Sequence, residues 1–280
     1  MSKRHPLVRF SKKYEEILGR YSDGNICVTK AMQTFLNDKW GIKSTVLYDK
    51  PFDNFGKANL EDWHKVFLKY TDLSEGKDES KFTKINEEGI VELKSDRPVL
   101  IVSSTSWTPD EDFSLLFDAM KEYDKDCNLP KAFCVVTGKG PEKEKYKKLI
   151  KEFPFKNVQW SFPWLEPEDY PILIGSADLG ICLHMSSSNL DLPMKVLDMF
   201  GCEVPVLAVK YDCIGELVHE NTNGLLFDTD QELAKQIKMI LEGFPSKCNK
   251  LNKFRENLKN YPKWQSNWNS NALPIFSNDQ

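Results

Sequence analysis

A lysine and an aspartate stand three residues apart in the apolar segment "PMKVLDMFG", residues 193–201. Pro193 predicts the first turn of a helix, where its fixed φ fits and its missing N–H is not needed. On such a helix Lys195 and Asp198 share one face. Lys195, beside the free N–H groups of the helix start, suits a phosphate, and Asp198 suits ribose hydroxyls. The alternative is an exposed Lys–Asp surface pair, which the apolar neighbours disfavour.

A run of hydroxyl side chains, Ser103 to Ser106, follows the apolar segment 99–102. We expect that segment to be a buried strand of a parallel sheet. Hydroxyl and backbone N–H groups at the end of such a strand suit a diphosphate. The alternative is that these same residues serve as ordinary helix caps. For the helix that follows the loop, we expect Thr108 or Asp110 as the cap.

Two glycines flank a lysine in "VVTGKGPE", residues 135–142. Gly138 and Gly140 permit close backbone approach, and Lys139 adds a positive charge, so this loop is a candidate phosphate cradle. A simple tight turn is the alternative. The spacing matches neither G-x-G-x-x-G nor the P-loop pattern, which disfavours NAD binding and P-loop chemistry.

Alternating apolar segments and helical patterns predict an α/β fold with a parallel sheet. The carboxyl ends of parallel strands lie at one edge, where ligands bind. Four polar loops should therefore line that edge together: residues 103–109, 137–141, 162–169 and 184–192.

The same pattern divides the chain into four parts. Residues 1–50 read as part of one α/β unit, and residues 98–245 as a complete one. Residues 51–97 read as a linker with one helix and a charged, mobile loop. Residues 246–280 read as a helical tail.

The composition limits the possible partners. The net charge of −4 disfavours a nucleic acid. Seven scattered cysteines without a C-x-x-C pair indicate reduced thiols rather than a disulfide framework or a zinc site. No apolar run approaches the roughly 20 residues of a membrane-spanning helix, and the basic, amphipathic start is not a signal peptide. We expect a soluble chain, with membrane-surface binding through that start as the alternative.

Several segments together resemble glycosyltransferases of the GT-B fold, which have two facing Rossmann-like domains. The similarity is greatest to the chitobiosyldiphosphodolichol beta-mannosyltransferase family, in "NICVTKAM", "VSSTSWTPDEDFSLLFDA", "VVTGKGP", "SSSNLDLPMKVLDMFGC" and "ELVHENTNGLLF". Many GT-B enzymes grip the donor with an E-x7-E pattern, whose second acid corresponds to Asp198. Its first position is Leu190, so the strict pattern fails, and Asp191 is one residue out of register.

The resemblance implies a GT-B fold with one complete Rossmann-like domain and part of a second, shortened at its amino end and lacking a membrane anchor. It implies inverting transfer of mannose from GDP-mannose, in beta-1,4 linkage, to the lipid-diphosphate acceptor chitobiosyl-diphosphodolichol, for protein N-glycosylation. The implied location is the cytosolic face of the endoplasmic reticulum, with other mannosyltransferases of the pathway as partners. It implies no cofactor and no metal. The D-x-D triplet "DTD" at 228–230 resembles the motif of metal-dependent glycosyltransferases, but we interpret it as a capping turn. The alternatives are an inactive paralogue or isoform that keeps the fold as a binding module, and an unrelated nucleotide-binding enzyme such as an epimerase.

The resemblance also implies roles for individual residues, while no catalytic base is assigned. The donor diphosphate would contact Ser104, Thr105 and Ser106 and be flanked by Gly138, Lys139 and Gly140. The sugar, phosphate and ribose would be held by Asp191, Lys195 and Asp198. The guanine would lie near Trp164. His5 is a candidate for the acceptor diphosphate, with a surface histidine at a helix start as the alternative. Asn189 stands where a glycine is expected, in a tight loop that requires left-handed φ.

Overall fold

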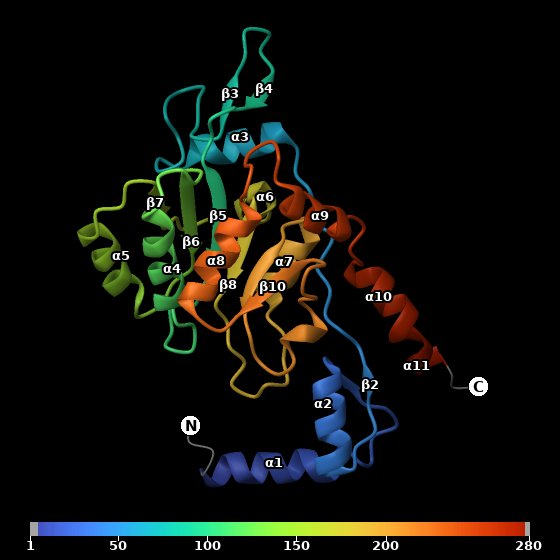
Figure 1. Cartoon of the computed structure of the whole chain (residues 1–280). Coiled ribbons are helices and arrows are strands. Elements are labelled where there is room, and N and C mark those ends of the chain that lie inside the picture. The colour runs from blue at the N-terminus through green and yellow to red at the C-terminus, as the bar shows by residue number, and fades with distance from the viewer. Residues whose placement is uncertain (1–4, 278–280) are drawn as a thin grey trace.

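A six-stranded parallel sheet forms the centre of the protein in the computed structural model, which describes residues 5–277 (Figure 1). Its spatial order is β10-β9-β8-β5-β6-β7. The strands are β5 (Val99–Ser104), β6 (Ala132–Thr137), β7 (Val158–Ser161), β8 (Leu179–Cys182), β9 (Val206–Val209) and β10 (Gly224–Phe227). The strands are almost continuously apolar because helices cover both faces of the sheet.

Each face of the sheet has its own core. On one face lie α4 (Ser114–Asp124), α5 (Lys143–Glu152), α8 (Asp230–Ile240) and α9 (Asn249–Leu258). On the other lie α3 (Leu60–Lys69), α6 (Asp169–Ser176), α7 (Met194–Gly201) and the 3-10 turn η2 (Ile214–Glu216). The predicted α/β class is therefore confirmed. The predicted capping by Thr108 or Asp110 is wrong, since α4 begins at Ser114.

The order of the strands places a crevice at the centre of the sheet. The chain runs outward through β5, β6 and β7 on one side, and through β8, β9 and β10 on the other. β5 and β8 are direct neighbours, so the loops that leave their carboxyl ends turn to opposite sides. Ligands of open α/β sheets bind at this switch point.

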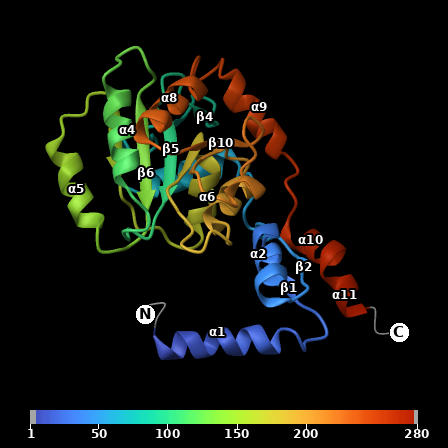
Figure 2. The ribbon, with the colours of Figure 1, turned by 60° about the horizontal axis from the view of Figure 1, so that its bottom comes forward.

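The first fifty residues form a small unit with a parallel pair of strands. The unit comprises α1 (Pro6–Leu18), β1 (Ile26–Cys27), α2 (Lys30–Phe35), the π-helical turn η1 (Leu36–Trp40) and β2 (Thr45–Val46). Thr29 caps α2 by accepting a hydrogen bond from the Met32 N–H. Figures 1 and 2 show this unit on the side of the sheet where the strands end.

The segment 51–97, predicted to hold one helix and a mobile loop, also contains a hairpin, and the mobility itself stays a prediction. After α3 the chain forms an antiparallel hairpin of β3 (Thr83–Ile85) and β4 (Val91–Leu93). Leu73 and Phe82 are fully buried in the core on the α3 face. The buried hydroxyls of Ser80 and Thr83 bond to each other at 2.7 Å. Two apolar anchors and this hydroxyl pair thus attach an otherwise charged segment to the core.

The carboxy-terminal helices return to the first unit, which matches the predicted helical tail. After α9 the chain forms α10 (Trp264–Asn271) and α11 (Leu273–Ser277). The Asn267 side chain donates to the Tyr48 carbonyl at 2.8 Å, and the Trp264 N–H to the Pro51 carbonyl at 3.1 Å. The domain limits themselves stay a prediction, and residues 1–4 and 278–280 of the outer two parts lie outside the described residues.

Candidate functional site

Lys195 and a carboxylate, Glu111, meet in the crevice between the loops that follow β5 and β8. The Lys195 ammonium donates to Oε1 of Glu111, whose side chain is only 2% exposed. The other oxygen of Glu111 accepts from the Thr105 hydroxyl and, at 2.7 Å, from the Ser106 N–H. Lys195 thus pairs with an acid from the opposite loop, and the alternative of a Lys195–Asp198 surface pair is wrong.

Glu111 is ionised in this setting. Burial alone would raise its pKa, but hydrogen bonds from His184, Lys195 and Thr105 outweigh burial and hold the pKa well below its usual range. An ammonium has three N–H donors, and Glu111 takes one, so the others remain for a ligand. Glu111 is not among the residues predicted for the site, because nothing in the acidic run Asp110 to Asp112 shows which acid turns inward.

The loop after β8 carries a second ionised acid, Asp191. Its Oδ1 accepts hydrogen bonds from Ser186 at 2.6 Å and Ser188 at 2.7 Å. Burial would raise the pKa of Asp191, but these two bonds and the nearby His184 lower it overall. The His184 ring lies between the two acids, 3.8 Å from Glu111 and 3.6 Å from Asp191.

Asn189 at the tip of this loop has φ 58°, as predicted for the position where a glycine was expected. Pro193 precedes the first turn of α7 as its N-cap and has extended ψ, one position earlier than predicted. The loop and the start of α7 therefore turn sharply beside Lys195.

Asp198 faces a different neighbour, Tyr170. The Tyr170 hydroxyl donates to Oδ2 of Asp198 at 3.4 Å and lies 3.0 Å from the Ser104 hydroxyl. The Thr137 hydroxyl donates to Ser104 at 3.0 Å, which completes a chain from the ends of β6 and β5 through α6 to α7. Burial raises the pKa of Asp198 to about 6, although the bond from Tyr170 lowers it in part.

The raised pKa of Asp198 predicts opposite effects on stability and on binding. Because the folded pKa lies above the unfolded one, ionisation of Asp198 costs stability as pH rises toward and through about 6. Asp198→Asn should therefore raise the melting temperature at pH 8 and have a smaller effect at pH 4.5. If the carboxylate holds a ribose, the same variant should weaken nucleotide binding at pH 8. An equal change in melting temperature at both pH values would contradict the first expectation.

The glycine loop lies directly against the hydroxyl loop. A Cβ at Gly138 would come within 1.8 Å of the Thr105 carbonyl oxygen, and one at Gly140 within 1.8 Å of the Ser106 carbonyl oxygen. Gly138 also has φ 113°, which favours glycine. These glycines therefore allow two loops to touch, which fits the tight-turn alternative, and contact with a phosphate stays a prediction.

Lys139 and Trp164 lie together at the rim of the same edge. The Lys139 ammonium is 3.7 Å from the centre of the Trp164 ring, and 57% of Trp164 is exposed. A cation over the indole face contributes attraction but covers one side of the ring. Stacking of a base on Trp164 stays a prediction.

The remaining predicted residues have internal or local roles in the structure. The Ser104 hydroxyl lies 3.0 Å from the Tyr170 hydroxyl, and the Thr105 hydroxyl donates to Glu111, so both already have protein partners; their contact with a diphosphate stays a prediction. Of the three hydroxyl residues only Ser106 is exposed. His5 is exposed and caps α1 by accepting from the Leu7 N–H at 3.3 Å, as its alternative predicts.

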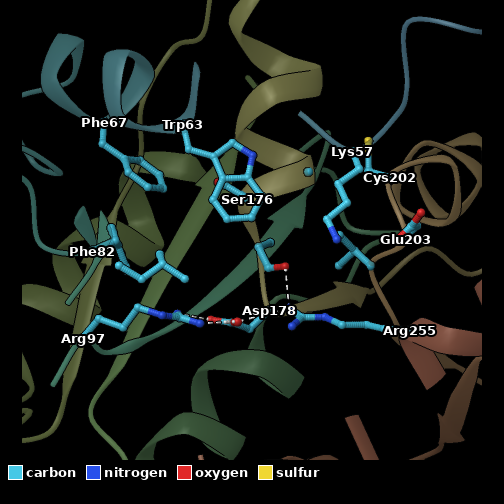
Figure 3. A pocket seen from close by; sticks show the side chains of 14 residues that line it. Lys57, Trp63, Phe67, Phe82, Arg97, Ser176, Asp178, Cys202, Glu203 and Arg255 are labelled. Atoms are coloured by element: carbon cyan, nitrogen blue, oxygen red, sulfur yellow. Dashed lines mark hydrogen bonds and ion pairs between the residues drawn. The ribbon is translucent and has the colours of Figure 1, made fainter. Parts of the chain in front are cut away.

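A cavity of about 130 Å³ lies at the opposite edge of the sheet (Figure 3). Its floor is Asp178, which accepts two hydrogen bonds from Arg97, at 2.6 and 2.9 Å, and one from Arg255 at 3.1 Å. These residues precede β5 and β8 or lie on α9, on the side where strands begin. The charges are already paired, so we assign this cluster to stability.

Residues 5–277 contain neither a membrane-spanning helix nor a cluster of metal ligands. None of their helices combines the length and apolar character needed to pass through a bilayer. Among the same residues, no group of three or more histidine, cysteine, aspartate or glutamate side chains is arranged to hold a metal ion.

Comparison with known proteins places these features in a family context. A family model described as "Glycosyl transferases group 1" matches residues 85–261. Human chitobiosyldiphosphodolichol beta-mannosyltransferase is 46% identical, over 97% of this chain and 62% of its own length. The Candida albicans enzyme of the same name is 36% identical, over 98% and 57%. UDP-glycosyltransferase TURAN of Arabidopsis thaliana is 40% identical, over 97% and 66%. The chain thus spans about three fifths of the length of these relatives.

Solved structures agree on the fold. HepE of Anabaena, in complex with UDP and glucose, superposes with a TM-score of 0.67 at 17% identity, covering 96% of this chain and 67% of that chain. A glycosyltransferase from Rickettsia africae gives 0.69 at 15% identity, with the same coverage. The expected GT-B type fold, with one complete Rossmann-like unit and part of another, is confirmed.

Proposed function

Since this chain belongs to the group 1 glycosyl transferases, we propose that it is a mannosyltransferase with GDP-mannose as donor. The acceptor is a chitobiosyl-diphosphodolichol lipid, and the new linkage is beta-1,4, as in protein N-glycosylation. The observation that carries the proposal is the 46% identity, over 97% of this chain, to an enzyme named for that reaction. Family membership contradicts the alternative of an unrelated nucleotide-binding enzyme.

The residues of the crevice suit the departure of a diphosphate. In the transfer, the acceptor hydroxyl oxygen gives up its proton and bonds to the anomeric carbon of mannose, while the bond from that carbon to the GDP oxygen breaks and GDP leaves. Negative charge then grows on the diphosphate, and donors already fixed around it stabilise the transition state. Lys195 and the amino end of α7 supply positive charge, while Ser106 supplies an exposed hydroxyl. The proposal uses these groups and calls for no metal ion.

The sugar and ribose need acceptors of hydrogen bonds, because both are rich in hydroxyls. Asp191 has a half-exposed, ionised carboxylate beside His184, and Asp198 lies deeper, against Tyr170. We assign Asp191 to the mannose and Asp198 to the ribose. Lys139 and Trp164 then border the guanine at the rim.

The small first unit belongs to the acceptor side in this proposal. It lies beyond the carboxyl ends of the strands, where the donor loops also lie (Figure 2). His5, at the start of α1, is the candidate contact for the acceptor diphosphate. Because the acceptor is linked to a lipid, we place the transfer reaction at the cytosolic face of the endoplasmic reticulum membrane. Other mannosyltransferases of the pathway are the proposed partners there.

A transfer assay tests the proposal directly. Incubation with GDP-[¹⁴C]mannose and a phytanyl-diphosphate chitobiose should give a labelled trisaccharide lipid that β-mannosidase cleaves. UDP-glucose should give no product, because the guanine and mannose contacts are absent. Absence of product together with calorimetric binding of GDP-mannose would favour the alternative, a non-catalytic binding module. Absence of both would contradict the donor assignment.

A further inference from the structure

The first unit and the sheet unit meet at a seam formed by Thr29, Lys30, Ala31 and Tyr48 on one side and Leu190 and Glu216 on the other. Glu216 makes three hydrogen bonds across it. One carboxylate oxygen accepts from the Lys30 N–H at 2.7 Å and the Tyr48 hydroxyl at 2.7 Å, and the other accepts from the Ala31 N–H at 2.9 Å. A single side chain of η2 therefore holds three groups of the first unit.

The chemistry of this contact favours a strong and directional link. Lys30 and Ala31 are the first residues of α2, whose N–H groups have no partner within the helix. A carboxylate at this end satisfies two of them and also meets the positive end of the helix dipole. Burial and the bond to Glu216 raise the pKa of Tyr48, so its hydroxyl stays a donor.

The seam continues directly into the donor loop. The Thr29 hydroxyl is fully buried and donates to the Leu190 carbonyl at 2.6 Å, while it accepts the capping bond from Met32. The next carbonyl, that of Asp191, accepts from the Tyr211 hydroxyl at 3.1 Å. The backbone that carries Asp191 is thus held from both units at once.

The seam is poorly filled by side chains, which increases the importance of these bonds. A cavity of about 480 Å³ lies along it, lined among others by Val28, Tyr48, Leu192, Glu216 and Tyr261. Where apolar packing is incomplete, hydrogen bonds and chain connections must fix the relative position of the two units.

We propose that Glu216 is a positioning residue for the donor loop, residues 186–193. By clamping the start of α2, it keeps Thr29 on the Leu190 carbonyl and so fixes the backbone that presents Asp191. The effect on the reaction rests on the proposed function, whereas the mechanical coupling between Glu216 and the loop does not.

Amide hydrogen exchange of the whole chain without ligand tests the coupling. Glu216→Ala should speed exchange at Lys30 and Ala31 by roughly tenfold or more, because charge-assisted bonds protect them. It should also speed exchange in residues 186–193, and Thr29→Val should do the same in that loop. Tyr48→Phe, which removes one bond and keeps the ring, should give a smaller change of the same pattern. Glu220→Gln, an exposed acid nearby, is the control.

Three results would overturn the proposal. Faster exchange at α2 with an unchanged 186–193 loop would show that the clamp is local. An unchanged rate at Lys30 and Ala31 would show that there is no clamp. An increase that spreads to β5 and β6 would show a general loss of structure rather than a role at the seam.

A kinetic measurement then connects the coupling to the reaction. Glu216→Ala should raise the KM for GDP-mannose several-fold. The amide exchange rates of β5 and β6 should stay unchanged in the same variant. Wild-type protein that neither binds nor turns over GDP-mannose would defeat the proposed function, and the exchange data would still decide the coupling. Exchange that confirms the coupling, with KM unchanged in an active enzyme, would overturn the positioning role alone.

Discussion

Lys195→Ala should weaken GDP-mannose binding at least about 30-fold, since truncating one partner of a buried charge pair costs about 2 kcal/mol or more. In an active enzyme, kcat should also fall about 100-fold or more, because charge on the departing diphosphate grows in the transition state. Lys195 is fixed by Glu111 before any donor arrives, so its remaining N–H groups need little reorganisation to meet a phosphate. Calorimetry and the transfer assay measure the two losses.

The obvious objection is that Lys195→Ala leaves Glu111 buried without its partner, which destabilises the fold. Lys195→Ala combined with Glu111→Gln removes that charge and separates the explanations. The double variant should regain thermal stability without regaining donor affinity. Recovery of affinity would mean that Lys195 acts only by neutralising Glu111. Lys151→Ala, at the exposed end of α5, should leave both quantities unchanged.

The sequence predicted the sheet and its ligand edge because those features have local signals. Apolar strands, the glycines at 138 and 140, and Pro193 before α7 are all visible within a few residues. They were enough to place Lys195, Asp191 and the two loops at one edge, where the structure has them. The parallel order of the strands then follows from short connections and helical crossovers.

The partners of those residues could not be predicted, since they come from distant positions. Glu111 lies 84 residues from Lys195, and Tyr170 lies 28 residues from Asp198. The same distance in sequence hid the anchoring of the 51–97 segment, where Phe82 packs against Phe133 of β6. Side-chain spacing along one helix suggested that Lys195 and Asp198 act together, but tertiary contacts turn them to different neighbours.

The second large effect concerns stability, at the opposite edge of the sheet. Asp178→Ala should lower the free energy of unfolding by about 3–5 kcal/mol, because Arg97 and Arg255 then lose their shared buried carboxylate. Asp178 also accepts the Leu100 N–H at 2.9 Å, so the start of β5 loses a partner. At about 2–4 °C per kcal/mol, the melting temperature should fall on the order of 10 °C. Asp118→Ala, which breaks an exposed pair with Lys121, should change it little.

The destabilisation caused by removing the Asp178 charge should depend on pH, whereas a loss of packing alone should not. Burial would raise the pKa of Asp178, but the bonds and charges of Arg97 and Arg255 outweigh it and lower the pKa below the ordinary value. A lowered folded pKa contributes stability that is present above the unfolded pKa, about 3.9, and lost as pH falls through the folded one. The gap between wild type and Asp178→Asn in urea unfolding should therefore be full at pH 7 and shrink below about pH 4. A gap that stays constant down to pH 3 would mean that the shape of the side chain, and not its charge, holds the two arginines.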